Sequence, residues 1–340
     1  MSKLTVRFLY DYVDEALWRM SVYYTMNALN AAGHDATTGN ILAHPLGKAD
    51  VYVFYRCVTL KALDAMREAK AQGFVVYAID DYLFQPDCKL HWKITPEGYL
   101  QFFKVADAVA LSSQHLLDKA DVPHKFRYYT TIDQESFELL KRQEKPEGSD
   151  FAIGWLAGHS RQGTDKFVKE ILAIINDRLS LDQRCVFHQF GRHPLAGPFT
   201  QVKMVQNPYI PVGKWKELYQ KFASLGLDVA ICPLPEDDEF AHCKSELKFV
   251  ESGAMGAPLV ASRMEQFKGV IQDGENGFFA STPEEFADKI LRLMTEPGLA
   301  KRMGEKAREQ VERECLAPAR TQQWLDGLSR VMKECGRVKN

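Results

Sequence analysis

The stretch CKSELKFVESGAMGAPLVAS, residues 243–262, combines charged and small residues at spacings that could bind an anionic ligand. Lys244 and Lys248 lie on either side of an expected helix start, which we expect Ser245 to cap. The free N–H groups at a helix start and the helix dipole together form a site for an anion such as a phosphate. Glu251 follows in the second turn, where a carboxylate can accept two hydrogen bonds from the hydroxyls of a ribose.

A purely structural explanation of the same charges is also open. Lys248 and Glu251 are three positions apart on the expected helix, so they can form an ion pair. Lys244 can pair with the acidic run EDDE at 236–239. The small residues Ser-Gly-Ala-Met-Gly-Ala at 252–257 would let the helix pack closely on a sheet. The elements around the stretch therefore have to decide between the two explanations.

Short apolar runs alternate with longer amphipathic stretches along the chain, which is typical of a parallel α/β fold. The expected strands are 5–10, 51–58, 74–80, 106–113, 125–131, 151–157, 185–191, 228–235 and 258–262. The expected helices include those at about 14–32, 60–73, 164–177, 214–226 and 246–255, one that begins at Thr282-Pro283, and an almost wholly helical tail from 284 to 338. Ligands bind such sheets at the carboxyl ends of the strands.

A chain of 340 residues exceeds what one hydrophobic core usually covers, so we expect two domains. The polar stretch KRQEKPEGSD at 141–150 reads as the linker between them. The predicted fold is α/β, with two Rossmann-like, doubly wound parallel sheets. We expect an N-terminal domain over 1–148, a C-terminal domain over 149–316, and a C-terminal helix over 317–340 that could pack back on the N-terminal domain.

Composition excludes several classes of protein. No stretch has the roughly 18 consecutive apolar residues that a membrane-spanning helix needs. The 7 cysteines are scattered and never form a C-x-x-C pair, which argues against a zinc site and for a reducing, cytoplasmic compartment. Of the 43 Lys/Arg and 45 Asp/Glu, residues 1–148 hold 17 and 19, which leaves 26 and 26 for the remainder. This even balance disfavours nucleic-acid binding without removing it.

Several segments, in order along the chain, resemble those of retaining GT-B glycosyltransferases of the glycogen-synthase-like, family-four kind. The most specific is ELKFVESGAMGAPLVAS followed by VIQDGENGFFASTPEEFADKILRLMTEPGLAKRMGEKARE. The others are ALWRMSVYYTMNALNAAGHDA, ADVYVFYR, VVYAIDDYLF, ADAVALSSQHL and AIGWLAGHS. The resemblance implies two Rossmann-like domains and a nucleotide sugar held mainly by the C-terminal one.

Carried over residue by residue, the resemblance implies that Glu251 is the second glutamate of a Glu-x7-Glu motif and binds the ribose. The first glutamate would fall at Cys243, so recognition of the donor sugar must differ here. The pattern Lys244-Ser245-x-x-Lys248, with Glu246 at the helix start, resembles a subgroup that has lysines at this helix start, and such lysines fit a diphosphate ligand.

The resemblance further places a basic pair after the first strand of the C-terminal domain. Arg161 and Lys166 match this pair loosely, and His159 competes for the same role, next to Gly158. Tyr209 could stack against a base or pack on the sheet as a turn residue.

In the N-terminal half, Asp80 and Asp81 end a strand where contacts with donor or acceptor hydroxyls, or a turn role, are both open. Arg19 and Arg56 stand where that domain would face a ligand, although an exposed arginine is usually a surface residue. The stretch HWKITPEGYLQFFK at 91–104 is either an aromatic platform for an acceptor or an amphipathic helix.

We therefore expect a cytoplasmic, metal-independent glycosyltransferase that needs no cofactor beyond its nucleoside-diphosphate sugar, most simply a UDP-sugar. The expected acceptor is a glycan or a lipid-linked polysaccharide precursor. Two alternatives remain: transfer to hydroxymethylated pyrimidines in DNA, and a non-catalytic module that only binds a nucleotide sugar.

Overall fold

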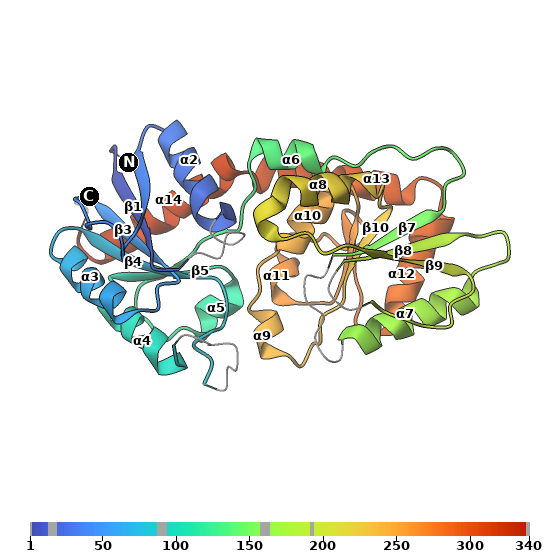
Figure 1. Ribbon diagram of the computed structural model, residues 1–340, viewed down its shortest axis with the longest axis horizontal. Coiled ribbons are helices and arrows are strands. Elements are labelled where there is room, and N and C mark those ends of the chain that lie inside the picture. The colour runs from blue at the N-terminus through green and yellow to red at the C-terminus, as the bar shows by residue number, and fades with distance from the viewer. Residues whose placement is uncertain (1, 13–18, 87–93, 157–163, 191–193, 338–340) are drawn as a thin grey trace. The chain divides into compact units, whose positions relative to one another are not determined.

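The structure is a computed structural model that describes residues 2–12, 19–86, 94–156, 164–190 and 194–337. The chain forms two compact units (Figure 1). The first comprises Met1–Ile132, Cys243–Ser245 and Leu316–Asn340, and the second comprises Asp133–His242 and Glu246–Cys315. The predicted boundary at 148/149 and the predicted linker at 141–150 thus differ from this division, which falls at 132/133.

The first unit is built on a six-stranded parallel sheet with the strand order β2-β1-β3-β4-β5-β6. Its strands are β1 (Thr5–Tyr10), β2 (Asp35–Asn40), β3 (Val51–Tyr55), β4 (Phe74–Ile79), β5 (Ala108–Leu111) and β6 (Lys125–Arg127). Its helices are η1 (Arg19–Tyr23), α2 (Tyr24–Ala31), α3 (Leu60–Lys70), α4 (Pro96–Val105), α5 (Gln114–Lys119) and α14 (Ala317–Glu334). Because β2 lies on one side of β1 and β3 on the other, the chain reverses direction across the sheet between β1 and β3.

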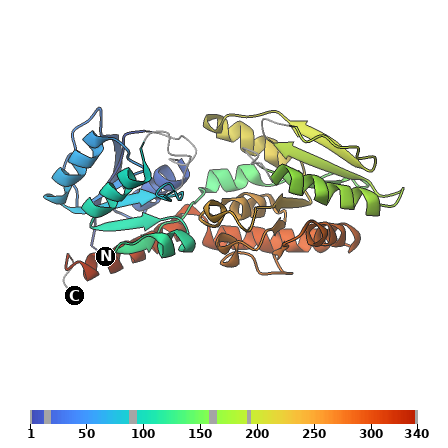
Figure 2. The same cartoon turned by 90° about the horizontal axis from the view of Figure 1, so that it is seen from below.

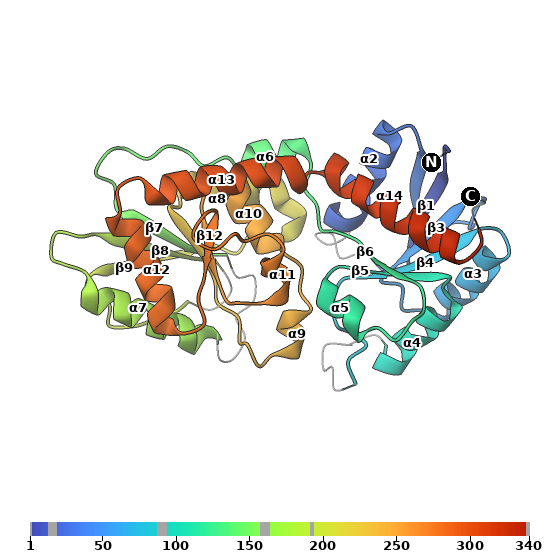
Figure 3. The ribbon, with the colours of Figure 1, turned by 180° about the vertical axis from the view of Figure 1, so that it is seen from behind.

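The C-terminal helix α14 is part of the core of the first unit (Figures 2 and 3). Its buried face, which includes Trp324 and Leu328, packs against Phe8 and Phe126 of the sheet. Gly327 allows this close approach, because a Cβ there would lie 2.8 Å from the ring of Phe126. The apolar positions of α14 therefore complete one face of a sheet that begins more than 300 residues earlier in the chain.

The second unit has the same layout, with the strand order β12-β11-β10-β7-β8-β9 and all neighbours parallel. Its strands are β7 (Phe151–Trp155), β8 (Cys185–Phe190), β9 (Val202–Asn207), β10 (Val229–Cys232), β11 (Leu259–Ala261) and β12 (Gly277–Phe279). Its helices are α6 (Gln134–Leu140), α7 (Thr164–Arg178), η2 (Val212–Lys214), α8 (Trp215–Ser224), α9 (Glu239–His242), α10 (Leu247–Met255), α11 (Glu265–Lys268), α12 (Pro283–Thr295) and α13 (Leu299–Glu314).

The two parallel sheets confirm the predicted α/β fold. Thr282 and Pro283 begin α12 as expected, and the Thr282 hydroxyl accepts a hydrogen bond from the Glu285 N–H. Sequence patterning missed the edge strands β2 and β9, because an edge strand has a polar, partly exposed sequence that lacks a continuous apolar run. The strand predicted at 125–131 ends at Arg127.

Close helix packing positions α10 in the second unit. A Cβ on Gly304 of α13 would lie only 1.9 Å from the carbonyl oxygen of Gly256, the left-handed residue that ends α10. A Cβ on Gly253 would lie 2.7 Å from the Val311 side chain. Both helices are therefore in contact through backbone at glycine positions.

We expect Gly304→Ala to lower the free energy of unfolding by about 1–3 kcal/mol, because the added methyl group would force α10 and α13 apart. Thermal unfolding followed by circular dichroism measures the change. Gly269→Ala is the matched control, since a Cβ there meets nothing within 4 Å and its φ of −85° suits alanine. Equal unfolding temperatures for the two variants would contradict the packing argument.

Candidate active site

The carboxyl ends of β7 and β10 meet at the point where the chain reverses direction across the second sheet. From β7 the chain runs outward through β8 and β9, and then returns to form β10, β11 and β12 on the other side. Ligands of open parallel sheets bind in the crevice at such a point. After β10 the chain forms the short helix α9 and then α10, which carries Lys248 and Glu251.

α10 is a mostly buried helix of nine residues whose polar side chains lie near its start. Glu246, not Ser245, occupies the N-cap position, because the N–H groups of Phe249 and Val250 both donate to the Glu246 carbonyl oxygen. No side chain caps the helix. The prediction that Ser245 is the cap is therefore wrong by one residue.

Glu251 is 5% exposed, and its Oε2 accepts a hydrogen bond from the Lys248 Nζ at 2.7 Å. The lysine side chain is 34% exposed, so the ion pair has one buried and one accessible partner. A carboxylate enclosed in this way needs a cation to offset the loss of its hydration. The ion pair expected between Lys248 and Glu251 is thus formed. The Lys248 ammonium group nevertheless stays at the helix start, where an anion could reach it.

Cys243–Ser245, which precede the N-cap residue Glu246, belong to the first unit. Cys243 is fully buried, and its carbonyl oxygen accepts a hydrogen bond from the Ser113 hydroxyl at 3.0 Å. Lys244 Nζ lies 3.8 Å from Asp81 Oδ1. The position of the first motif glutamate therefore holds an enclosed thiol.

The two aspartates that follow β4 have different surroundings. Asp80 is 6% exposed, and its carboxylate pairs with Arg56, whose Nη1 lies 3.1 Å from Oδ1. Asp81 is 24% exposed and lies 3.9 Å from the same guanidinium group. The structure thus brings both predicted aspartates to the carboxyl edge of the first sheet and buries only one of them.

The other residues of the second unit that were predicted to bind the donor either lie apart from α10 or fall outside the described residues. Lys166 is 83% exposed in the first turn of α7, with its Nζ 3.8 Å from the Glu170 carboxylate. Tyr209 is 45% exposed and follows edge strand β9. Gly158, His159 and Arg161 lie outside the described residues.

In the described part of the predicted aromatic platform at 91–104, the aromatic side chains are buried in the core. Tyr99, Phe102 and Phe103 of α4 are each at most 6% exposed, and Phe102 stacks on Tyr77 with ring centroids 5.0 Å apart. The side chains serve to pack α4 on the sheet, so the alternative of an amphipathic helix is correct. Residues 91–93 lie outside the described part of the chain.

Arg308 holds the C-terminal end of α10 through hydrogen bonds that the sequence did not predict. Its Nη1 donates hydrogen bonds to the carbonyl oxygens of Ala254 and, at 3.3 Å, of Phe137 in α6. The guanidinium carbon lies 3.8 Å from the centroid of the Phe137 ring. Burial lowers the pKa of Arg308 from its ordinary value, in part offset by the nearby Glu138. Nothing in the helical sequence around Arg308 indicates these contacts.

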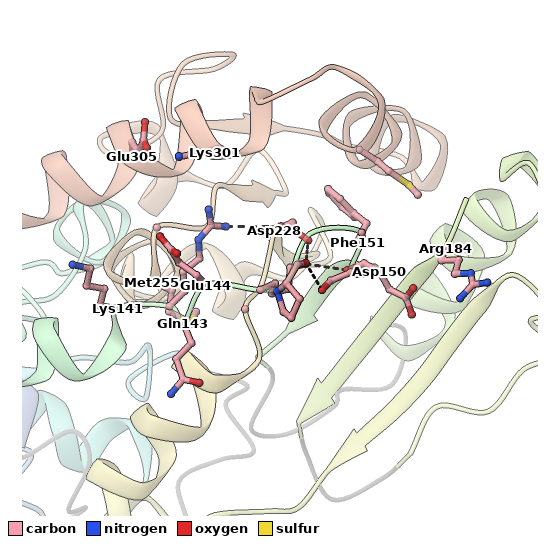
Figure 4. A pocket seen from close by; sticks show the side chains of 18 of the residues that line it. Lys141, Gln143, Glu144, Asp150, Phe151, Arg184, Asp228, Met255, Lys301 and Glu305 are labelled. Carbon is pink, nitrogen blue, oxygen red and sulfur yellow. Dashed lines mark hydrogen bonds and ion pairs between the residues drawn. The ribbon is translucent and has the colours of Figure 1, made fainter. Parts of the chain in front are cut away.

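A groove of about 940 Å³ opens at the opposite, amino edge of the second sheet (Figure 4). It is lined by the chain at 141–151 and by Arg184, Asp228 and the end of α10. Its central carboxylate, Asp228, is already paired with Lys145 and accepts a hydrogen bond from the Ala152 N–H at 2.8 Å. None of the described residues predicted for the site lines this groove.

No group of three or more His, Cys, Asp or Glu side chains in the described ranges could hold a metal ion. Within the same ranges, no helix is both long and apolar enough to cross a membrane.

Residues 151–296 match the family described as "Glycosyl transferases group 1". Over 83 residues, which are 24% of this chain and 20% of the relative, the chain is 31% identical to the trehalose synthase of Pyrococcus horikoshii. The chain thus spans a fifth of the length of this curated relative. It also covers 54% of a solved structure of TarM, at 14% identity and a TM-score of 0.58 over 82% of this chain.

Other solved structures match over their full length. A glycosyltransferase from Rickettsia africae is 13% identical, with a TM-score of 0.65 over 98% of this chain and 100% of that chain. HepE from Anabaena, in complex with UDP and glucose, is 13% identical, with a TM-score of 0.62 over 96% of this chain and 100% of that chain. These likenesses confirm the predicted fold, and residues 151–296 are similar to the glycosyl transferases group 1 family.

The Lys248–Glu251 pair can be tested by its contribution to stability. We expect Lys248→Met to lower the free energy of unfolding by roughly 1–3 kcal/mol, because it leaves the Glu251 carboxylate enclosed without its cation. The double variant Lys248→Met with Glu251→Gln should recover part of this loss, since it removes both charges. Thermal unfolding of the wild type, the single variants and the double variant gives the coupling. Strictly additive effects would show that the pair is not coupled.

Proposed function

We propose that this chain transfers a sugar from a nucleoside-diphosphate sugar to an acceptor hydroxyl. Its residues 151–296 match the glycosyl transferases group 1 family, and its fold is GT-B. The observation that carries the proposal is the position of the Lys248–Glu251 pair. It stands in the helix that begins at the reversal point of the second sheet, within the residues that match the family. The arrangement suits a ligand that has both a ribose and a diphosphate.

The two charged side chains of α10 bind different parts of the donor. One carboxylate oxygen of Glu251 accepts a hydrogen bond from Lys248, and the carboxylate also accepts hydrogen bonds from the ribose hydroxyls. The ammonium group of Lys248 and the N–H groups at the helix start receive the diphosphate. We take the nucleotide to be UDP, in keeping with the ligand of HepE, and assign Tyr209 to the base.

The chemical difficulty is the negative charge that develops on the departing diphosphate. Fixed donors at the helix start and a nearby cation stabilise such a charge without a metal ion. Lys248 supplies the cation, and we assign Lys244, Lys166 and Arg161 to the same task on the basis of the sequence. His159 and Gly158 complete the donor contacts in this proposal, and the reaction proceeds with retention of the anomeric configuration.

For the acceptor we propose a glycan or a lipid-linked polysaccharide precursor, bound through the aspartates at the end of β4. The first unit offers carboxylates there, and carboxylate oxygens accept hydrogen bonds from sugar hydroxyls. We place the reaction in the cytoplasm, in keeping with the free thiols of the six cysteines in the described residues.

The proposal is tested by incubating the full chain with UDP-, GDP-, ADP- and TDP-sugars in the presence of EDTA. Release of the nucleoside diphosphate reports turnover, and NMR of the product reports the anomeric configuration. Binding of every donor without any turnover would indicate a module that only binds nucleotide sugars. Transfer confined to hydroxymethylated duplex DNA, with affinity that falls steeply as salt rises, would overturn the glycan acceptor.

We expect Glu251→Ala to weaken UDP binding by roughly 10-fold or more, because hydrogen bonds to a charged group contribute about 1.5–3 kcal/mol. Isothermal titration calorimetry measures the dissociation constant. Glu275→Ala is the matched control: Glu275 pairs with Lys306 at 3.3 Å, is exposed, and precedes β12 at the amino edge of the sheet. An unchanged affinity in Glu251→Ala would remove the ribose assignment.

We expect Lys248→Ala to lower kcat by roughly 10- to 1,000-fold at saturating donor, in the range found when a donor to a developing charge is removed. Lys306→Ala, which removes the other partner of the control pair, should keep wild-type turnover. Initial rates of UDP release at several donor concentrations separate kcat from KM. A rise in KM alone would show that Lys248 contributes to ground-state binding only.

A further inference from the structure

Arg56 has an unusual backbone conformation at the carboxyl edge of the first sheet. Its φ is +49°, and in the described part of the chain it is the one residue other than glycine with a positive φ. It follows β3 directly, beside the point where the chain reverses direction across the sheet. A side chain in the left-handed region is disfavoured, and such positions cluster at functional sites.

Two contacts hold Arg56 in this conformation. Its backbone N–H donates to the carbonyl oxygen of Ala78 at 2.9 Å. Its Nη1 lies 3.1 Å from Oδ1 and 3.4 Å from Oδ2 of Asp80, so the guanidinium group is directed at the buried carboxylate. Burial alone would lower the pKa of Arg56, but Asp80 and its neighbours raise it above the ordinary value, and the side chain stays a cation.

The contacts of the Asp80 carboxylate are made with other side chains of the protein. The Tyr55 hydroxyl lies 3.4 Å from its Oδ2, and the Ser112 hydroxyl donates to its backbone carbonyl oxygen at 2.7 Å. Burial raises the pKa of Tyr55 and of Tyr128 well above the ordinary value, so both keep their hydroxyl protons. With a cation and a hydroxyl already against it, Asp80 at 6% exposure has little room for a ligand.

Asp81, the next residue, is placed differently. It is 24% exposed, and two cations lie near it at distances longer than a hydrogen bond: Arg56 Nη1 at 3.9 Å from Oδ2 and Lys244 Nζ at 3.8 Å from Oδ1. At these distances the cations stabilise the charge of the carboxylate without occupying its oxygen atoms. The oxygen atoms remain able to accept hydrogen bonds from hydroxyl groups.

We propose that the Asp81 carboxylate accepts a hydrogen bond from a hydroxyl group of the acceptor sugar, and that Arg56 is a positioning residue that acts through Asp81. Arg56 uses its contacts with Asp80 as an anchor and thereby holds its guanidinium group beside Asp81. The inference rests on the proposed function and sharpens it, because it divides the two aspartates into a buried anchor and a ligand contact. The occupant is a polyhydroxyl compound, for which a carboxylate with free acceptor capacity is suited.

The test uses the full chain, UDP-glucose as donor, and the best acceptor in a panel of methyl glycosides of hexoses and amino sugars. We expect Asp81→Asn to raise the KM for the acceptor at least 10-fold and to leave the affinity for UDP unchanged by calorimetry. Arg56→Met should have the same effect. The double variant should be no worse than either single variant, because the arginine acts through the aspartate. Arg56→Lys, which restores the charge but not the planar group, should recover part of the loss.

Loss of folding in Arg56→Met is a separate risk, because Asp80 would be enclosed without its cation. Arg56→Met combined with Asp80→Asn removes both charges and serves as the folded comparison. The matched control is the exposed pair Arg67 and Asp64 of α3, 2.6 Å apart, changed to Met and Asn, which should keep wild-type KM values.

Two results would overturn the inference alone: an unchanged acceptor KM in Arg56→Met, or effects of Arg56→Met and Asp81→Asn that multiply in the double variant. An acceptor KM that rises in Asp80→Asn but not in Asp81→Asn would reverse the roles of the two aspartates and overturn it as well. A wild-type chain that uses no acceptor of the panel, with any donor, would overturn the proposed glycan acceptor and this inference with it.

Discussion

The contact of α10 with α13 is the constraint on which the candidate donor site depends. The two helices touch through backbone at Gly256 and Gly304, and a Cβ on Gly304 would force them apart, because it would lie 1.9 Å from the Gly256 carbonyl oxygen. Arg308 adds hydrogen bonds to the last turn of α10, so the helix is fixed at the end opposite Lys248 and Glu251. A helix held rigidly at its buried end presents its first turn at a constant place, as a site that must meet a diphosphate requires.

Each unit places one enclosed carboxylate against one more accessible cation at the carboxyl edge of its sheet. In the second unit the pair is Glu251 with Lys248, and in the first it is Asp80 with Arg56. Removing a charge from water is costly, and a paired cation offsets only part of that cost. Stability alone therefore does not explain either pair. Both lie at the edge where parallel sheets bind their ligands, and there a charged pair can contact a ligand.

Much of this arrangement could be predicted from the sequence. Alternating apolar runs and amphipathic stretches indicated two parallel sheets, and the spacing of Lys248 and Glu251 indicated both an ion pair and a ligand site. The edge strands β2 and β9 could not be predicted, because pairing on one side only leaves their sequences polar. The start of α10 at Glu246 rather than at Ser245, and the fixation of its end by Arg308, depend on neighbours that no local pattern reveals.

By itself, the sequence determined the types of residue at the strand ends and the family that they resemble, since both are properties of order along the chain. Only the tertiary structure decided which of those residues meet. Asp80 and Asp81 are equivalent in the sequence, yet in the structure Asp80 is buried against Arg56 and Asp81 is only half-buried. Cys243 likewise stands where the resemblance places a glutamate, and only the structure shows that its thiol is fully buried. Distances between residues far apart in sequence depend on packing, and packing is set by the whole chain.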